Sequence, residues 1–405
     1  MNILFLALSF SEGGRVSSYE TLLRTFQKYG DKIFVACACE KRSSESPGIY
    51  TDKEMTILRV ATGNMTGNIG LIEKGISTIT IDSLFKKAIK KHYNEVKFDL
   101  IMYPTPPITL VNTVEYIKRR TGAKTYLLLK DIFPQNAVDM GMMSKSGIKG
   151  ILYHHFRNKE KKLYAVSDFI GCMSPANVEY VVRHNPEVNP EIVEVCPNCC
   201  RIPQEDPTLM ERDSTLLRAK YNIPNDAVIF LYGGNLGKPQ GIPFLINCLD
   251  KIKNNGKVFF IIIGEGSEYH KLRKFVDESG IKNTILLDYL PKAEYQEIAN
   301  KCDVGLIFLD YRFSIPNFPS RSLACLTSAM PMLVATDPVC DMGDIAEANG
   351  FGVKCLSNDP ESFAKAVDMM VKANRKDMGK NAWKFFLDNY TVDIAYSIIM
   401  KHFDN

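Results

Sequence analysis

The segment VIFLYGGNLGKPQG, residues 228–241, decides the class of the fold. Its first five residues are apolar and predict a buried strand, and a helical pattern over 242–254 follows the segment. Four glycines and Lys238 fall within residues 232–241. Glycine permits positive φ, so backbone N–H groups can approach a ligand closely, and Lys238 adds a positive charge. The segment therefore predicts a loop folded around a diphosphate, although it lacks the GxxxxGK[ST] order of a P-loop nucleoside triphosphatase.

Short apolar runs alternate with helical patterns on both sides of this segment. In the second half they predict strands at 228–232, 258–263, 284–287, 304–309 and 332–335. In the first half they predict strands at 3–8, 32–36, 100–103, 125–129 and 169–173. Such alternation is typical of βαβ units and parallel sheets. A polar, proline-containing segment from Pro197 to about Pro224 is expected to link the two halves. We therefore expect an α/β chain whose ligand binds in a cleft between the halves, outside the carboxyl ends of the strands.

The composition agrees with a two-domain globular protein. At 405 residues the chain exceeds the size at which one hydrophobic core keeps growing. With 45% hydrophobic and 24% charged residues it is not a disordered chain, a collagen or a coiled coil. A net charge of +4 gives little reason to expect a nucleic-acid partner, and we expect none.

The sequence also bears on the compartment. No apolar run approaches the roughly 18 residues that argue for a membrane-spanning helix. The apolar N-terminus has no basic region before it, which argues against a secretory signal. The 11 cysteines then suit reduced thiols, so we expect a cytoplasmic protein.

Two more glycine loops follow predicted strands. Gly13 and Gly14 come after the first strand, and Gly264 and Gly266 come after the strand at 258–263. Carboxyl ends of parallel strands meet at one edge of a sheet, so the second pair is expected beside Gly234. The pair Gly13-Gly14 taken alone is equally consistent with a tight turn that binds nothing.

Charged residues at two predicted element ends are candidates for chemistry. Pro319-Ser320-Arg321 is typical of a helix start, where Ser320 can cap the helix and Arg321 can hold a phosphate with its guanidinium fork. Lys130 and Asp131 follow the strand at 125–129, where a carboxylate can orient or deprotonate a hydroxyl. The alternatives are a surface arginine and a salt-bridged structural aspartate.

No metal site is expected. The cluster Cys196, Cys199 and Cys200 has no second CxxC or spaced histidine pair beside it. The six histidines include no pair at metal-ligand spacing.

The order of these motifs resembles that of the retaining GT-B glycosyltransferases, in particular glycosyltransferase family 4. The resemblance covers essentially the whole chain, through Gly13-Gly14, Val195-Cys196-Pro197-Asn198, the loop at 233–241, Gly264-Glu265-Gly266, Asp288-Tyr289-Leu290-Pro291, Cys302-Asp303-Val304-Gly305-Leu306 and Pro319-Ser320-Arg321. Asp131-Ile132-Phe133-Pro134 and residues 234–241 are similar to the D-[IL]-[FW]-P and GN-[IL]-G-x-x-QG motifs of a subgroup that builds bacterial surface polysaccharides. Each motif is moderately specific, and their order and spacing are strongly so.

This resemblance implies a GT-B fold of two Rossmann-like parallel-sheet domains facing each other across a cleft. The domains would span 1–203 and 204–390, with a helix over 391–405 packing back on the first. The second domain would hold a nucleoside-diphosphate sugar, with the base near Tyr289 and Leu290. The diphosphate would lie near Gly13, Gly14, Gly234, Asn235, Lys238, Gly264, Gly266, Ser320 and Arg321.

The resemblance also implies the reaction. The acceptor, a glycan or a polyprenyl-diphosphate-linked sugar, would enter near Lys130 and Asp131. The sugar would be transferred with retention of configuration and without a metal or another cofactor. Asp131 and Lys238 are the residues that we assign to catalysis.

The chain departs from the family pattern in two places. The broader family often has an arginine and a lysine where this glycine loop has Asn235 and Gln240, so Lys238 is inferred to take over part of the phosphate binding. The E-x7-E element of the family would place acids at Pro316 and Ala324, and neither is acidic. The second acid commonly holds the donor ribose, and Glu265 is a candidate to replace it.

Two basic stretches, 84–91 and 144–164, interleave lysines with apolar residues in the first half. Such stretches are candidates for peripheral contact with an anionic membrane. Ordinary helices solvated by lysines are the alternative.

The sequence thus predicts a metal-independent, retaining glycosyltransferase of the hexosyltransferase type, acting in capsule, O-antigen or exopolysaccharide synthesis. Two alternatives stay open. A UDP-sugar 2-epimerase would have the same fold and would need no acceptor. A non-catalytic nucleotide-sugar-binding protein would agree with the missing acids.

Overall fold

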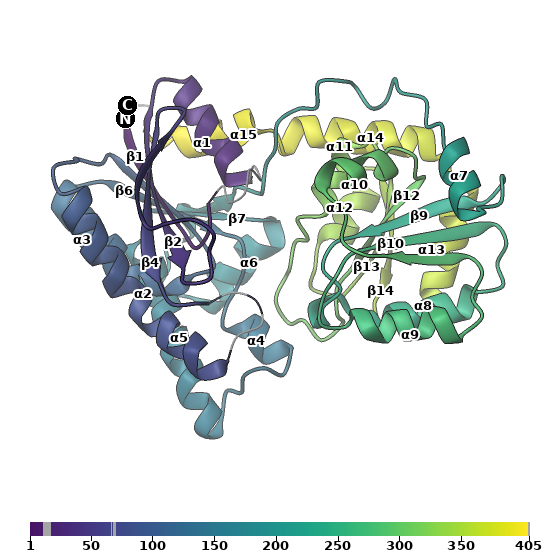
Figure 1. Cartoon of the computed structure of the whole chain (residues 1–405), viewed down its shortest axis with the longest axis horizontal. Coiled ribbons are helices and arrows are strands. Elements are labelled where there is room, and N and C mark those ends of the chain that lie inside the picture. Colours follow the sequence, from purple (N-terminus) through teal and green to yellow (C-terminus); the bar gives the residue numbers. More distant parts are fainter. Residues whose placement is uncertain (11–17, 66, 68–69, 404–405) are drawn as a thin grey trace. The chain divides into compact units, whose positions relative to one another are not determined.

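The computed structural model describes residues 1–10, 18–65, 67 and 70–403 (Figure 1). Gly13 and Gly14 lie outside the described residues. The chain divides into two compact units. Unit 1 comprises Met1–Cys200 and Val392–Asn405, and unit 2 comprises Arg201–Thr391. Each unit is built on its own mostly parallel sheet, so the expected α/β class with two parallel-sheet domains is confirmed.

Unit 1 contains an eight-stranded sheet in the order β3-β4-β2-β1-β5-β6-β7-β8. Its strands are β1 (Asn2–Ala7), β2 (Lys32–Glu40), β3 (Gly48–Asp52), β4 (Met55–Thr62), β5 (Leu100–Pro104), β6 (Lys124–Leu129), β7 (Phe169–Cys172) and β8 (Val193–Val195). All neighbours are parallel except the edge strand β3, which runs antiparallel to β4.

Helices cover both faces of this sheet. They are α1 (Ser18–Lys28), α2 (Leu71–His92), α3 (Val111–Thr121), α4 (Gln135–Asp139), α5 (Gly147–Val166), α6 (Pro175–His184) and α15 (Val392–Met400), with 3-10 turns η2 (Ile108–Leu110) and η3 (Pro190–Ile192). Side chains alternate along β1, so Leu4 and Leu6 pack with α2, α3, α5 and α6, whereas Ile3 and Phe5 pack with α1 and α15. The chain's last helix therefore belongs to the core of unit 1.

Unit 2 contains a six-stranded sheet in the order β11-β10-β9-β12-β13-β14, parallel throughout. Its strands are β9 (Val228–Gly233), β10 (Val258–Ile263), β11 (Thr284–Leu287), β12 (Val304–Phe308), β13 (Met332–Thr336) and β14 (Gly352–Leu356). The strand order reverses between β9 and β12. Open parallel sheets bind ligands at the carboxyl ends of the strands beside such a reversal.

The helices of unit 2 connect these strands. They are α7 (Thr215–Tyr221), α8 (Ile242–Ile252), α9 (Tyr269–Glu278), α10 (Lys292–Ala299), α11 (Ser322–Thr327), α12 (Met342–Ala348), α13 (Pro360–Lys372) and α14 (Arg375–Asn389), with the 3-10 turn η4 (Lys238–Gln240). Phe363, Ala366, Val367 and Met370 form one face of α13 and are buried in the core. Among the described residues, no helix is long and apolar enough to cross a membrane.

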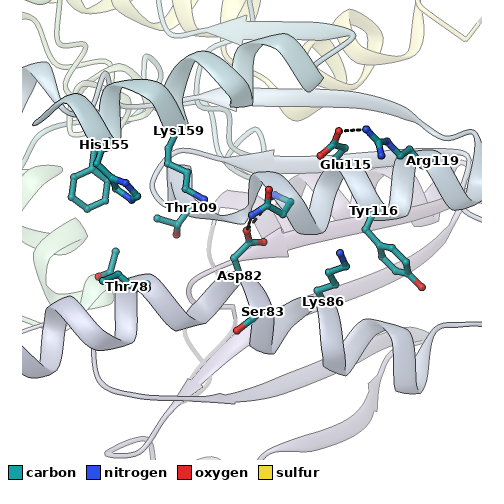
Figure 2. Close-up of a pocket in the computed structure, with 13 residues that line it drawn as sticks. Thr78, Asp82, Ser83, Lys86, Thr109, Glu115, Tyr116, Arg119, His155 and Lys159 are labelled. Carbon is teal, nitrogen blue, oxygen red and sulfur yellow. Dashed lines mark hydrogen bonds and ion pairs between the residues drawn. The ribbon is translucent and has the colours of Figure 1, made fainter. Parts of the chain in front are cut away.

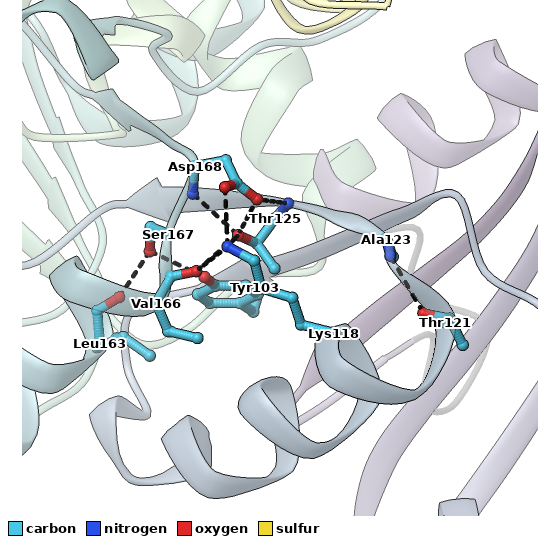
Figure 3. Close-up of polar contacts among 9 residues, drawn as sticks. All are labelled: Tyr103, Lys118, Thr121, Ala123, Thr125, Leu163, Val166, Ser167 and Asp168. Carbon is cyan, nitrogen blue, oxygen red and sulfur yellow. Dashed lines mark hydrogen bonds and ion pairs between the residues drawn. The ribbon is translucent and has the colours of Figure 1, made fainter.

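A polar network ties together the amino ends of β6 and β7 in unit 1 (Figure 3). Asp168 accepts hydrogen bonds from the backbone N–H and the hydroxyl of Thr125, each at 2.8 Å. Lys118 of α3 donates to Asp168 Oδ1 at 2.8 Å and to the Val166 carbonyl at 2.9 Å. One carboxylate thus joins two strands, α3 and the end of α5, at the sheet edge away from Lys130 and Asp131.

Replacing Asp168 with asparagine is expected to loosen this edge. The change removes the charge that pairs with the half-buried Lys118, and we expect local stability to fall by about 2 kcal/mol. Native-state hydrogen exchange of the β6 and β7 amides measures the loss. The control is Glu179→Gln, because Glu179 and Arg183 form an exposed ion pair on α6, which is worth a few tenths of a kcal/mol. Equal effects of the two variants would contradict the role given to Asp168.

Candidate functional site

The two glycine loops of unit 2 lie against each other through their backbones. Gly234 N–H donates to the Ile263 carbonyl at 2.9 Å, and Leu236 N–H donates to the Glu265 carbonyl at 2.8 Å. A Cβ on Gly264 would overlap the carbonyl oxygen of Gly234, and one on Gly266 would lie 2.5 Å from Leu236. Only glycine allows this approach, so the strand ends of β9 and β10 present adjacent, bare backbone.

The loop after β9 is braced from within. The buried side chain of Gln240 accepts hydrogen bonds from Gly237 N–H at 3.1 Å and from Asn235 Nδ2 at 3.2 Å. Tyr232 donates its hydroxyl to the Asn235 carbonyl at 2.7 Å. Gln240 therefore holds the shape of the loop, whereas Asn235 lies on its exposed side.

A cavity of about 440 Å³ opens at this edge of the sheet. Its walls come from the ends of β9, β10 and β11 and from α10 and α11. The residues that line it are Gly233, Gly234, Asn235, Ile263, Gly264, Glu265, Tyr289, Leu290, Tyr295, Arg321 and Ala324. The structure thus brings six of the residues predicted to bind the donor, Gly234, Asn235, Gly264, Tyr289, Leu290 and Arg321, around one space.

Arg321 supplies the positive charge of this cavity. Its guanidinium carbon lies 4.8 Å from the centre of the Tyr232 ring. Burial raises the pKa of Tyr232, against an opposing effect of Arg321, so the ring stays neutral and its face attracts the cation. Arg321 Nη1 is buried and has no hydrogen-bond acceptor among the described residues. A buried guanidinium N–H without an acceptor is costly, and an anionic ligand in the cavity would supply one.

Three predicted donor-binding residues lie away from the lining. Lys238 is exposed at the start of η4, and Gly266 packs behind the cavity against Leu236. The prediction that Ser320 caps a helix is wrong, because α11 has Arg321 at its cap position, without a side-chain cap hydrogen bond. Ser320 is exposed one residue earlier. Pro319 still sets the start of the turn, since its carbonyl accepts from Ser322 N–H and Oγ.

Tyr295 lines the cavity although the sequence analysis did not predict it, and Ala324, named there only for the acid that it lacks, lines the cavity as well. Tyr295 on α10 packs its ring where a Cβ on Gly233 would lie, so the glycine makes room for the aromatic wall. Ala324, at one of the positions where the family pattern has an acid, does line the cavity. Its methyl group cannot accept a hydrogen bond, and Glu265 is the carboxylate that lines the same space.

In unit 1, Lys130 and Asp131 stand at the carboxyl end of β6 and do not pair with each other. Lys130 donates from Nζ to the Cys196 carbonyl at 2.8 Å, and burial lowers its pKa. Asn136 Nδ2 donates to both carboxylate oxygens of Asp131, at 2.7 and 2.8 Å. Burial raises the pKa of Asp131, which the hydrogen bond from Asn136 opposes. Among the described residues no cation pairs with Asp131, so it is not a salt-bridged structural aspartate.

In the part of the chain that the structure describes, no group of three or more histidine, cysteine, aspartate or glutamate side chains is arranged to hold an ion. Cys196 and Cys199 are buried, and burial raises the pKa of both thiols.

Comparison with known proteins shows which family the unit that contains the cavity resembles. Residues 213–385 match the family model "Glycosyl transferases group 1". Unit 2 thus contains a region similar to the group 1 glycosyl transferases, which is called the group 1 domain below. All residues that line the cavity fall within this range.

Two curated relatives extend the similarity beyond this domain. The chain is 24% identical over 332 residues to "Probable glycosyltransferase WbjE" of Pseudomonas aeruginosa, covering 80% of this chain and 78% of the relative. It is 21% identical over 301 residues to "Putative colanic acid biosynthesis glycosyl transferase WcaI" of Escherichia coli strain K12, covering 72% and 69%.

Solved structures confirm the GT-B fold of the whole chain. Sucrose-phosphate synthase from Thermosynechococcus elongatus matches with a TM-score of 0.73 at 14% identity, over 99% of this chain and 98% of that one. WaaG, a glycosyltransferase involved in lipopolysaccharide biosynthesis, matches with a TM-score of 0.66 at 13% identity, over 99% of both chains.

The backbone contact in the group 1 domain gives a direct test. Gly264→Ala would force the two loops apart and distort the cavity, so we expect nucleotide binding to be lost and the domain to be less stable. Gly256→Ala is the matched control, because a Cβ at that exposed turn meets nothing within 4 Å. Thermal unfolding with and without UDP measures both effects. A Gly264→Ala variant that UDP stabilises as it does the original protein would refute the assigned geometry.

Proposed function

We propose that the chain is a retaining glycosyltransferase of family 4 that acts in bacterial surface polysaccharide synthesis. It transfers a hexose from a nucleoside-diphosphate sugar to a glycan or a polyprenyl-diphosphate-linked sugar, without a metal. The observation that carries this proposal is the cavity of the group 1 domain, where Nη1 of Arg321 is buried without an acceptor among the described residues, beside two strand ends of bare glycine backbone. Supporting it, relatives are named for colanic acid and O-antigen biosynthesis.

The donor occupies the cavity with its parts in a defined order. The base lies against Tyr289 and Leu290 on the β11 side, where an aromatic ring and an aliphatic side chain offer stacking surface. The diphosphate lies at Gly234 and Gly264, where no side chain keeps it from the backbone, and pairs with Arg321. UDP is the first nucleotide to test, because the Anabaena HepE structure, similar in fold with a TM-score of 0.69 at 13% identity over 100% and 99% of the chains, contains it.

Glu265 holds the donor ribose in this proposal. A ribose offers hydroxyl donors, and a carboxylate at the cavity wall accepts from two of them. Position 324, where the family pattern has its acid, is an alanine on the same wall. In this proposal Glu265, in the loop after β10, takes the role that the acid on α11 has in the family pattern.

Transfer proceeds by front-face displacement. The bond between the anomeric carbon and the leaving phosphate oxygen breaks as the acceptor oxygen bonds to that carbon on the same face. The leaving phosphate oxygen accepts the proton of the acceptor hydroxyl. Arg321 and Lys238 stabilise the diphosphate as its charge grows. Asp131, whose raised pKa makes it a better proton acceptor, orients the acceptor hydroxyl, with Lys130 beside it.

The reaction takes place in the cytoplasm, at the inner face of the membrane. The stretches 84–91 and 144–164 fall on α2 and α5, and both helices carry exposed lysines. They also expose apolar side chains, since Ile79 is 75% and Ile151 is 73% exposed. A peripheral helix needs both features to lie on an anionic bilayer, where a polyprenyl-linked acceptor would be found.

Arg321→Ala tests the diphosphate site. We expect the Kd for UDP to rise about 10- to 100-fold, the effect of losing charged hydrogen bonds worth about 1.5–3 kcal/mol. Isothermal titration measures it. Arg312→Ala is the control, because Arg312 pairs with Asp310 two residues away and does not line the cavity. Lys238→Ala is expected to lower the transfer rate. Unchanged UDP affinity in Arg321→Ala, or a full transfer rate in Lys238→Ala, would contradict the respective assignment.

Glu265→Ala tests the ribose contact, and a second substitution, Ala324→Glu, tests whether binding can be restored. We expect UDP to bind about 10-fold more weakly while pyrophosphate binding is unchanged, because only UDP carries the ribose. Introducing Ala324→Glu into Glu265→Ala would return the acid to the position of the family pattern and restore UDP affinity. Equal loss of UDP and pyrophosphate binding would show that Glu265 acts elsewhere than on the ribose.

Incubation of a UDP-sugar without acceptor separates the proposal from its alternatives. A transferase leaves the sugar configuration intact, whereas a 2-epimerase accumulates the isomerised donor. A non-catalytic binding protein turns over no donor under any acceptor condition. The non-catalytic alternative is tested because positions 316 and 324 lack the acids of the family pattern.

A further inference from the structure

A second cavity, of about 510 Å³, lies within unit 1 between α2, α3 and α5 (Figure 2). It lies outside the group 1 domain, and no residue of the predicted site lines it. The two basic stretches meet here, because 84–91 contributes Lys86 and 144–164 contributes His155 and Lys159. Lys86 and Lys159, 73 positions apart in the sequence, thus share one space.

The acidic residues of this cavity are already engaged. Asp82 accepts hydrogen bonds from the backbone N–H and the side-chain amide of Asn112, at 3.3 and 2.7 Å. It also accepts from the N–H and the hydroxyl of Thr113, at 2.9 and 2.6 Å, and so fixes the first turn of α3 to α2. Glu115 pairs with Arg119 at 2.5 Å. The carboxylates leave two lysines of the cavity uncompensated.

Lys86 and Lys159 are these two lysines, and they extend toward the space from opposite helices (Figure 2). The Lys86 ammonium lies 5.0 Å from the centre of the Tyr116 ring, a contact that stabilises a cation without neutralising it. Neither lysine forms an ion pair with a carboxylate in the described part of the chain. Two ammonium groups facing one cavity repel each other, and an anion between them relieves that repulsion.

Thr109, on η2, is the second observation that points to a ligand. It lines the cavity, its side chain is only 6% exposed, and its buried Oγ1 has no hydrogen-bond partner among the described residues (Figure 2). An unsatisfied buried hydroxyl costs about 1–3 kcal/mol, so the fold favours a bound acceptor or donor at this atom. Ser83, exposed on α2, adds another hydroxyl to the lining.

We propose that this cavity is a binding site for a phosphate group. Lys86 and Lys159 supply its two counter-charges, and the Thr109 hydroxyl donates a hydrogen bond to one phosphate oxygen. A doubly charged tetrahedral anion suits two compact ammonium groups approaching from different directions, whereas a planar carboxylate is better matched by an arginine fork. Ile79, which lines the cavity and is 75% exposed, makes one rim apolar. The phosphate belongs either to a lipid headgroup or to a water-soluble phosphate ester.

The test uses the full-length protein with Arg321→Ala in every variant, so that the donor cavity does not contribute to anion binding. Inorganic phosphate is titrated by calorimetry, and vesicles of phosphatidylglycerol and phosphatidylcholine are compared with vesicles of phosphatidylcholine alone by sedimentation. We expect Lys86→Ala/Lys159→Ala to weaken phosphate binding at least 10-fold. Lys90→Ala/Lys91→Ala removes two exposed lysines of α2 that do not line the cavity and is expected to have little effect on phosphate.

The vesicle arm identifies the source of the phosphate. If Lys86→Ala/Lys159→Ala loses binding to anionic vesicles more than the Lys90→Ala/Lys91→Ala control does, the site takes a lipid headgroup. If it loses phosphate binding alone, the site takes a soluble phosphate ester. Equal losses in the two double variants, or no binding of either probe by the parent protein, would overturn the proposal.

Thr109→Val gives a readout that does not depend on net charge. It removes the hydroxyl at nearly constant volume, so we expect weaker phosphate binding with no loss of thermal stability, because the lost group has no partner in the fold. Unweakened phosphate binding would remove Thr109 from the site. In the Arg321-containing protein, UDP affinity of all these variants is expected to be unchanged, which keeps this site distinguishable from the proposed transferase function.

Discussion

The close contact between the loops that follow β9 and β10 is the constraint on which the candidate site depends. Gly264 approaches the Gly234 carbonyl more closely than any side chain permits, and hydrogen bonds from Gly234 and Leu236 lock the two loops together. This contact gives the cavity a floor of backbone rather than side chains. Because this floor carries no charged side chain, a positive charge has to come from a neighbouring element, and Arg321 supplies it above the Tyr232 ring.

Departures from the family pattern become intelligible once the contacts of each residue are known. Gln240 stands where a lysine is common, and it holds the glycine loop by accepting from Gly237 and Asn235. That loop is therefore kept in shape by neutral hydrogen bonds, and in the proposed donor site fewer cations would face the diphosphate. If Arg321 carries more of that charge, its contact with Tyr232 matters more, because an aromatic face keeps a guanidinium in place without neutralising it.

Much of the fold was predictable because its central strands are short apolar runs that alternate with helical patterns. Four strands were missed: the edge strand β3 is mostly exposed, β4 is interrupted by Arg59, β8 has three residues, and β14 is interrupted by the exposed Lys354. In the site, glycines and Arg321 were predictable from local motifs. Tyr295 was not, because its place opposite Gly233 arises only when α10 packs on the sheet. Ser320 does not cap α11, because Arg321 holds the cap position.

The net charge of +4 says little about where the protein's charge acts, and unit 1 shows why. Asp82 on α2 accepts hydrogen bonds from the first turn of α3, and Glu115 on α3 forms an ion pair with Arg119. A carboxylate so engaged no longer serves nearby lysines, so Lys86 and Lys159 retain their positive charge toward the cavity although acids lie beside them. If only the charged residues that line the cavity are counted, the lining is nearly neutral. If their ion-pair and hydrogen-bond partners are also considered, Lys86 and Lys159 have no carboxylate partner and the Thr109 hydroxyl is unsatisfied among the described residues. A phosphate group in the cavity would be attracted by these unpaired charges, since Coulomb attraction in a partly enclosed site depends on the charges that nearby partners do not neutralise.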